Sequence, residues 1–246
     1  MKLAEVLSWL DNELEIDRFD DVSNNGLQIG REGDTLERVA FGVDASADFF
    51  ARAAEFNAQL CVVHHGISWG GGIKRLSGGV YNVVKEAIRS NIALYASHLP
   101  LDANMKYGNN WEIARFLELD CIKPAFSYHG NTIGVTGSAT RSATYRIGQC
   151  DIELKEGMRI GVCSGGAGEF AEDAGDLGCS LFVTGEASWA DEIAAENVGM
   201  KMLTAGHYET ETFGVKALAR AMHKALGVET FFIAHQRDLQ NRGGFQ

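Results

Sequence analysis

The chain alternates between apolar runs of strand length and segments with helical spacing, and this alternation limits the fold more than any other feature. Strand patterns at 39–43, 60–65 and 92–96 are separated by helix patterns at 47–56 and 80–89. A βαβαβα order favours a largely parallel sheet whose faces are covered by helices. We therefore expect an α/β fold.

The middle of the chain has a different character. Between residues 128 and 157, Gly, Ser and Thr become frequent, residues alternate in polarity and no helical period is visible. Alternation of helix and strand patterns resumes after it. The sequence therefore predicts a first α/β half at 1–127, a β-rich connector at 128–157 and a second α/β half at 158–246.

The two halves share sequence features at fixed offsets. Residues 60–69 can be laid on 180–189 at an offset of 120, where the Ser-Trp pairs coincide. A His-x-x-x-acid element occurs at 98–102 and again at 207–211, at an offset of 109. This repetition predicts an internal duplication, and pseudo-twofold packing of the halves would bring equivalent strand ends together at their interface.

Composition limits the class of protein. The chain has 246 residues, of which 46% are hydrophobic and 22% charged, as in a soluble globular protein. It has no apolar run of bilayer length, and its first residues form an amphipathic helix pattern rather than a signal peptide, so we expect no membrane association and a cytoplasmic location. The five cysteines are scattered and odd in number, which indicates reduced core residues. A net charge of −11 disfavours nucleic acid as a partner.

Histidines and carboxylates follow several of the predicted strands. His64 and His65 close one strand, and each His-x-x-x-acid element follows another. His207 and Glu211, four residues apart at the start of a helix, can project from one face of its first turn. Imidazole and carboxylate together suit Zn, Mn, Fe, Co or Ni. The alternative for any one of these histidines is a core or surface role.

Other residues at strand ends have weaker patterns. At the offset of 120, Glu186 corresponds to Gly66, directly after the counterpart of the histidine pair. It could act as a proton shuttle, support a metal ligand or have only a structural role. His98 could be a further ligand, a general acid or base, or a substrate contact. The glycine-rich turn at 164–168 could bind an anion on backbone amides or be a plain tight turn.

Six motifs together carry a family resemblance. They are Asn25-Gly26-Leu27-Gln28, Val63-His64-His65-Gly66, His98-Leu-Pro-Leu-Asp102, Gly108-Asn109-Asn110, Thr184-Gly185-Glu186 and Gly206-His207-Tyr208-Glu209-Thr210-Glu211. In this respect the chain resembles the NGG-interacting-factor-three-like family, often labelled GTP cyclohydrolase I type 2 homologues. The motifs fall in order over nearly the whole chain.

The resemblance implies a two-part α/β subunit, a dinuclear metal site between the halves and a toroidal homohexamer. Two divalent metal ions per subunit would be held by His64, His65, Asp102, His207 and Glu211. His98 and Glu186 are the expected catalytic side chains.

Two classes of function remain open. The first is a dinuclear metal-dependent hydrolase acting on a small molecule such as a nucleotide, as a cyclohydrolase or a phosphoesterase. The second is a non-catalytic metal-binding assembly, adaptor or storage protein. An open coordination position would favour the enzyme, and closed coordination the structural role.

Overall fold

The computed structural model describes residues 1–236 as two compact units, which we describe separately. Unit 1 comprises Met1–Pro100 and the described residues from Val215 on, and unit 2 comprises Leu101–Gly214. Two helices, α4 (Leu99–Ala103) and α8 (His207–Leu226), have residues in both.

Unit 1 is built on a five-stranded sheet with the order β1-β4-β3-β2-β12. Its other elements and strands are α1 (Leu3–Leu14), the 3-10 helix η1 (Ile16–Arg18), β1 (Gly26–Ile29), β2 (Arg38–Asp44), α2 (Ala47–Glu55), β3 (Leu60–His65), α3 (Gly78–Arg89), β4 (Ala93–Ala96) and β12 (Glu229–Phe232). Four strands are parallel, and β1 is an antiparallel edge strand.

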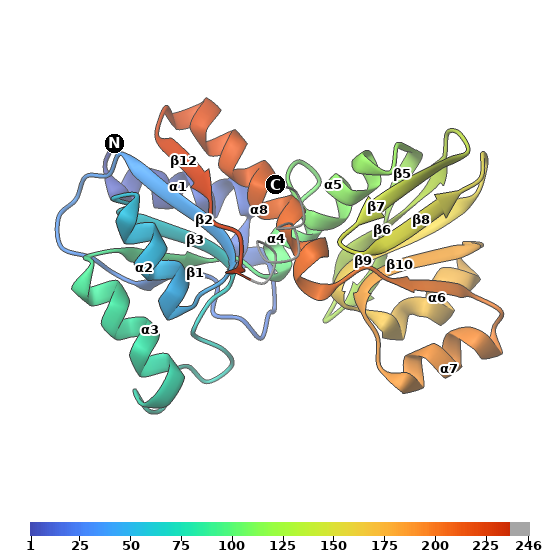
Figure 1. Cartoon of the computed structure of the whole chain (residues 1–246), viewed down its shortest axis with the longest axis horizontal. Coiled ribbons are helices and arrows are strands. Elements are labelled where there is room, and N and C mark those ends of the chain that lie inside the picture. The colour runs from blue at the N-terminus through green and yellow to red at the C-terminus, as the bar shows by residue number, and fades with distance from the viewer. Residues whose placement is uncertain (237–246) are drawn as a thin grey trace, which may run out of the picture. The chain divides into compact units, whose positions relative to one another are not determined.

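Helices cover both faces of this sheet. Phe49 and Phe50 of α2 and Ala87 of α3 pack with the apolar side chains of one face, where Figure 1 shows these two helices. On the other face the buried Tyr95 of β4 donates its hydroxyl to Asp11 of α1. Burial on both faces explains why the strands are continuous apolar runs rather than alternating ones.

Unit 2 has its own five-stranded sheet with the order β11-β10-β9-β6-β5 and a separate two-stranded sheet of β7 and β8. Its elements, besides α4 and the start of α8, are α5 (Asn109–Phe116), β5 (Leu119–Tyr128), β6 (Asn131–Ala139), β7 (Ala143–Ile147), β8 (Cys150–Leu154), β9 (Arg159–Gly166), the 3-10 helix η2 (Gly168–Phe170), α6 (Ala171–Asp176), β10 (Leu181–Glu186), α7 (Trp189–Asn197) and β11 (Lys201–Thr204). Strands β9, β10 and β11 pair in parallel, whereas β6 pairs antiparallel with both β9 and β5.

The unit 2 sheet also has two covered faces. Ile113 of α5 and Ile152 of β8 pack with one face. On the other face Phe126, Phe170 and Phe182 form a cluster of rings beside α6. Helix α7 follows strand β10 (Figure 1). Ser188 caps the helix through a capping box, which fixes where the helix starts.

Parallel strands bring chemically useful residues to one edge of each sheet. In unit 1 the carboxyl end of β2 carries Asp44, the end of β3 carries His64 and His65, and β4 leads into His98. In unit 2, β9 ends within the glycine-rich segment at 164–168, β10 ends at Glu186, and β11 leads into His207. The carboxyl edge of a parallel sheet is where α/β folds bind ligands.

The mixed α/β fold agrees with the expectation, but the chain is partitioned differently from the parts predicted at 1–127, 128–157 and 158–246. Strand β12 pairs with β2, which places the residues from Val215 on in unit 1. Strand β5 pairs with β6, which keeps residues 101–127 with the segment after them. The internal duplication remains a prediction. Among residues 1–236, no helix has both the length and the apolar character that a membrane span requires.

Candidate functional site

Three histidine rings of unit 1 lie close together at the carboxyl edge of its sheet. One ligand nitrogen from each of His64, His65 and His98 lies within 4.8 Å of those of the other two. The ring centroid of His98 is 5.1 Å from that of His64 and 5.7 Å from that of His65. The structure thus groups two predicted metal ligands with a residue for which the sequence predicts a catalytic role.

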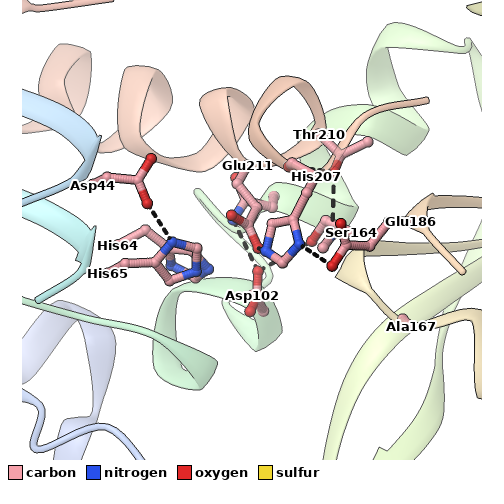
Figure 2. A network of polar contacts seen from close by, with 12 residues as sticks. Asp44, His64, His65, Asp102, Ser164, Ala167, Glu186, His207, Thr210 and Glu211 are labelled. Atoms are coloured by element: carbon pink, nitrogen blue, oxygen red, sulfur yellow. Dashed lines mark hydrogen bonds and ion pairs between the residues drawn. The ribbon is translucent and has the colours of Figure 1, made fainter. Parts of the chain in front are cut away.

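Each ring of this group is held through its Nδ1 atom. The pairs are His64 with the carbonyl oxygen of Ser97 at 2.9 Å, His65 with Oδ1 of Asp44 at 2.8 Å and His98 with Oδ1 of Asp21 at 2.9 Å. Figure 2 shows the Asp44 carboxylate directed at the His65 ring. Hydrogen bonds of this kind fix the orientation and tautomer of metal-binding histidines.

Asp21 is a buried carboxylate that sequence reasoning missed. Its side chain is 1% exposed. Besides His98 it accepts hydrogen bonds from the Asn25 side chain and from the backbone amides of Ser23 and Leu99. Burial acts to raise the pKa of Asp21, but the hydrogen bond and charge of His98, with the other donors, outweigh burial and lower it to about 2.

In unit 2, His207 lies between two carboxylates at the start of α8. Its Nε2 is 3.1 Å from Oε1 of the buried Glu211, and its Nδ1 is 3.0 Å from Oε1 of the exposed Glu186 (Figure 2). The hydrogen bond to Glu211 raises the pKa of His207 to about 9, against the effect of burial and with further help from the charge of Glu211 and from Glu186. The two carboxylates on either side of His207 therefore favour a positive charge at this position.

Asp102 is held in place by two side chains. It is 7% exposed, and its Oδ1 accepts hydrogen bonds from Asn109 Nδ2 at 2.8 Å and from Ser164 Oγ at 3.1 Å. The Asn109 oxygen in turn accepts the backbone N–H of Gly214 at 2.6 Å. Asn109 belongs to one of the motifs, but its contact with Asp102 could not be inferred from spacing.

The glycine-rich turn at 164–168 begins within the last residues of β9 and lies against these acids. Ser164 contacts Asp102, and a Cβ built on the next residue, Gly165, would lie 2.5 Å from Oε1 of Glu211 and 3.4 Å from Nε2 of His207. Gly165 also has a φ of +68°, which a residue with a Cβ adopts at a cost. The absence of a Cβ at Gly165 thus leaves room for Glu211 and His207 in their observed positions.

Two backbone amides of the turn are already used within unit 2. The amide of Gly165 donates to Thr210 Oγ1 at 3.1 Å, and that of Ala167 donates to Thr184 Oγ1 at 3.3 Å. These two amides are therefore already satisfied within unit 2, which counts against the anion-binding interpretation of the segment.

The predicted site residues are divided between the two units. His64, His65 and His98 belong to unit 1, whereas Asp102, Glu186, His207 and Glu211 belong to unit 2. Asp21 and Asp44 were not predicted. The one available signal was the position of Asp44 directly after the strand pattern at 39–43.

The comparisons with known proteins agree with one another. The model of the Duf34/NIF3 (NGG1p interacting factor 3) family matches residues 1–238. The chain belongs to this family. A Pyrococcus horikoshii relative named "GTP cyclohydrolase 1 type 2 homolog" is 39% identical over 95% of this chain and 98% of its own.

Solved structures of other proteins share the fold. The protein ybgI, described as of unknown function, has a TM-score of 0.83 and 26% identity over 96% of this chain and 98% of its own. TTHA1606 from Thermus thermophilus has a TM-score of 0.75 and 30% identity over the same shares of the two chains. The Duf34/NIF3 family resemblance expected from the motifs is confirmed.

The donor atoms fit a divalent metal. The His/Glu groups supply imidazole nitrogen and carboxylate oxygen, which Zn, Mn, Fe, Co and Ni accept. The imidazoles of unit 1 are fixed by hydrogen bonds at Nδ1, and Asp102 is fixed by Asn109 and Ser164. Such outer contacts are typical of metal sites, so this member of the Duf34/NIF3 family has a possible metal-binding set.

Proposed function

We propose that the chain is a hydrolase that depends on two divalent metal ions and acts on a small molecule, with nucleotides as the first class to test. The proposed ligands are His64 and His65 from unit 1 and Asp102, His207 and Glu211 from unit 2. Relatives named "GTP cyclohydrolase 1 type 2 homolog" support the choice of nucleotides.

The observation that carries this proposal is the arrangement of the ligand groups within each unit. Buried or half-buried histidines and acids follow parallel strands, and hydrogen bonds from side chains and backbone hold them in fixed orientations. Burying such groups is costly unless they are paired or bind a metal. A polar arrangement of this kind is expected at a catalytic site rather than in a structural core.

Divalent ions at these residues would supply Lewis acidity and an activated water for hydrolysis. Glu186 contacts Nδ1 of His207, so its role is to orient that ring or to pass a proton at the exposed side of the pair. The buried Glu211 is held against His207 and Gly165 and contributes negative charge that offsets the cations. The two donors at Oδ1 of Asp102 fix the orientation in which its carboxylate would meet a cation.

The experiment is a hydrolysis screen of metal-loaded protein that separates the two bond types. GTP is incubated with protein loaded with Zn²⁺, Mn²⁺, Fe²⁺ or Co²⁺. Opening of the imidazole ring is followed as a mass gain of one water with loss of purine absorbance. Phosphoester cleavage is followed as release of phosphate from GTP and from a p-nitrophenyl ester.

The control is a pair of ligand variants, His65→Ala and Glu211→Ala, each checked for an unchanged circular dichroism spectrum. The proposal expects turnover by the wild type that both variants lose. Full metal content without turnover on any of these substrates would contradict the hydrolase and favour a metal-binding assembly or storage protein.

A further inference from the structure

Trp69 is a large apolar side chain that lies beside the histidines of unit 1 and is only partly buried. It follows shortly after His65, the last residue of β3, and it is 38% exposed. Its ring centroid is 5.2 Å from that of His98 and 6.0 Å from that of His65. An indole that reaches solvent at the carboxyl edge of a parallel sheet lies where α/β folds bind ligands.

The indole nitrogen already has a partner, which leaves the surface of the ring for contact. Nε1 of Trp69 donates a hydrogen bond to the carbonyl oxygen of Gly66 at 3.0 Å. The interplanar angles of the indole are 73° with His98 and 45° with His65, so neither imidazole is stacked parallel on it. No other ring within residues 1–236 contacts the indole. It therefore offers a surface for offset stacking, an arrangement that aromatic pairs prefer.

The turn that carries Trp69 is fixed by a side chain of β1. Oε1 of Gln28 accepts hydrogen bonds from the backbone amides of Ile67 at 2.7 Å and of Ser68 at 3.2 Å. A Cβ built on Gly66 would overlap Oε1 of Gln28, so glycine at this position makes room for the amide group. The turn is thus held in one conformation by contacts within unit 1.

Backbone contacts with the segment at 22–24 hold the residues around Trp69. Trp69 forms an antiparallel bridge with Ser23, and the amide of Gly70 donates to the carbonyl oxygen of Val22 at 2.6 Å. A ring that is positioned before a ligand arrives loses little conformational entropy on binding. Trp69 is therefore preorganised, although part of it is exposed.

Trp189 is the counterpart of Trp69 at the offset of 120 and serves as a comparison. It begins helix α7 in unit 2 and is 75% exposed. No aromatic ring within the described residues contacts it. The same Ser-Trp pair thus gives a separate surface side chain in unit 2 and a ring beside imidazoles in unit 1.

We propose that Trp69 is a binding residue on which a planar heteroaromatic ring of the ligand stacks, and that it gives the site a preference for such rings. The inference rests on the proposed function, because it takes the nucleotide class and assigns a residue to the base. An aromatic platform contacts the π face that every base has, so the preference is for planar rings rather than for one base.

The test measures binding separately from turnover. The zinc-loaded full chain is titrated with guanosine by isothermal titration calorimetry, beside Trp69→Leu and Trp69→Phe at equal metal content. Trp69→Leu is expected to weaken guanosine binding roughly 5- to 100-fold, and Trp69→Phe, which keeps an aromatic ring, to retain most of the affinity. Ribose 5-phosphate is the probe without an aromatic ring, and Trp69→Leu should leave its binding unchanged.

Tryptophan emission gives a second readout, because it reports contact with the indole itself. Guanosine should quench the emission of the wild type and quench that of Trp69→Leu much less. Trp189→Leu is the matched control, since it removes an exposed tryptophan of unit 2, and it should keep both the quenching and the affinity. Circular dichroism and metal analysis show whether each variant keeps its fold and its ions.

Turnover adds a third readout if the screen finds hydrolysis of GTP. A stacking contact is made equally in the bound substrate and in the transition state, so its loss acts on substrate binding. Trp69→Leu should therefore raise KM for GTP about as much as it weakens guanosine binding, with little change in kcat.

Two results would overturn the inference and leave the proposed function standing. In the first, the wild type hydrolyses GTP but neither binds guanosine nor shows quenching. In the second, Trp69→Leu binds guanosine as tightly as the wild type. Conversely, guanosine binding that Trp69→Leu weakens and Trp69→Phe retains supports the inference even if the screen finds no hydrolysis, a result that removes the proposed function alone.

Discussion

Gly165 lies directly against the carboxylate of Glu211. A Cβ at this position would come within 2.5 Å of Oε1, which is closer than atoms that are not bonded can approach. Its φ of +68° is a second reason for glycine. Glycine at position 165, near the end of β9, therefore leaves the space that the carboxylate of a proposed metal ligand occupies.

Gly165→Ala should weaken metal binding as well as stability, because the methyl group displaces Glu211. We expect metal affinity to fall about tenfold or more. Gly157→Ala is the matched control, since Gly157 has a φ of +77° but nothing within 4 Å of its Cβ position. The control should lose about 1–2 kcal/mol of stability and keep its metal affinity. Chelator competition and urea denaturation measure the two quantities, and equal metal affinities for the two variants would contradict the contact.

Asn109→Ala should also affect the metal site, because Asn109 links Asp102 to the backbone of Gly214. Its loss leaves two buried groups with one partner fewer, at a cost of about 1–3 kcal/mol for each. Asn110→Ala is the comparison, since Asn110 is equally buried but bonds to the backbone of Ile133 and Ser164. Both variants should melt at lower temperature, and Asn109→Ala should show the larger loss of metal affinity. The reverse order would show that Asn109 does not position Asp102.

Tyr95→Phe should destabilise unit 1 without touching the site. The side chain of Tyr95 is fully buried, and its hydroxyl donates a hydrogen bond to Asp11 at 2.8 Å. Burial raises the pKa of Tyr95, and the hydrogen bond to Asp11 and the charge of Asp11 raise it further. Losing a hydrogen bond to a charged acceptor costs about 1.5–3 kcal/mol. Unfolding curves in denaturant should show this loss for Tyr95→Phe and no change for Tyr81→Phe, since residue Tyr81 is 46% exposed. An unchanged midpoint for Tyr95→Phe would mean that this hydrogen bond contributes nothing net.

The cysteines should differ in reactivity according to burial. Burial raises the pKa of the Cys61 and Cys163 thiols, and the negative charges of Asp102, Glu169 and Glu211 add to the effect on Cys163. A raised pKa means that the reactive thiolate forms only at higher pH. Iodoacetamide at pH 8 should therefore label the exposed Cys121 first, and Cys61 and Cys163 only after unfolding. Peptide mapping that finds early label on Cys163 would contradict this.

The sequence predicted elements whose signal is local. The helix expected at 47–56 is α2, and the strand that ends in two histidines is β3. Helix α8 begins at His207, directly after Gly206, whose φ of +95° makes the turn into the helix. Hydrophobic periodicity predicts such elements because each of them depends on residues only a few positions away in the sequence.

Features that depend on distant pairing could not be predicted. Strand β5 contains Pro124 and has no alternating burial, and it is a strand because it pairs with β6. Asp21 contacts His98 across 77 residues of sequence, and no local sequence pattern predicts this contact. The return of the chain to unit 1 likewise depends on the pairing of β12 with β2, two strands that are far apart in the sequence.

The most direct test of the account is the metal content of the protein. The chain is purified without an affinity tag or chelator, incubated with Zn²⁺ or Mn²⁺, desalted and measured by elemental mass spectrometry beside His65→Ala and Glu211→Ala. About two ions are expected per wild-type chain, and fewer in each folded variant. A folded wild-type chain that retains no ion, or variants that retain as many ions as the wild type, would contradict it.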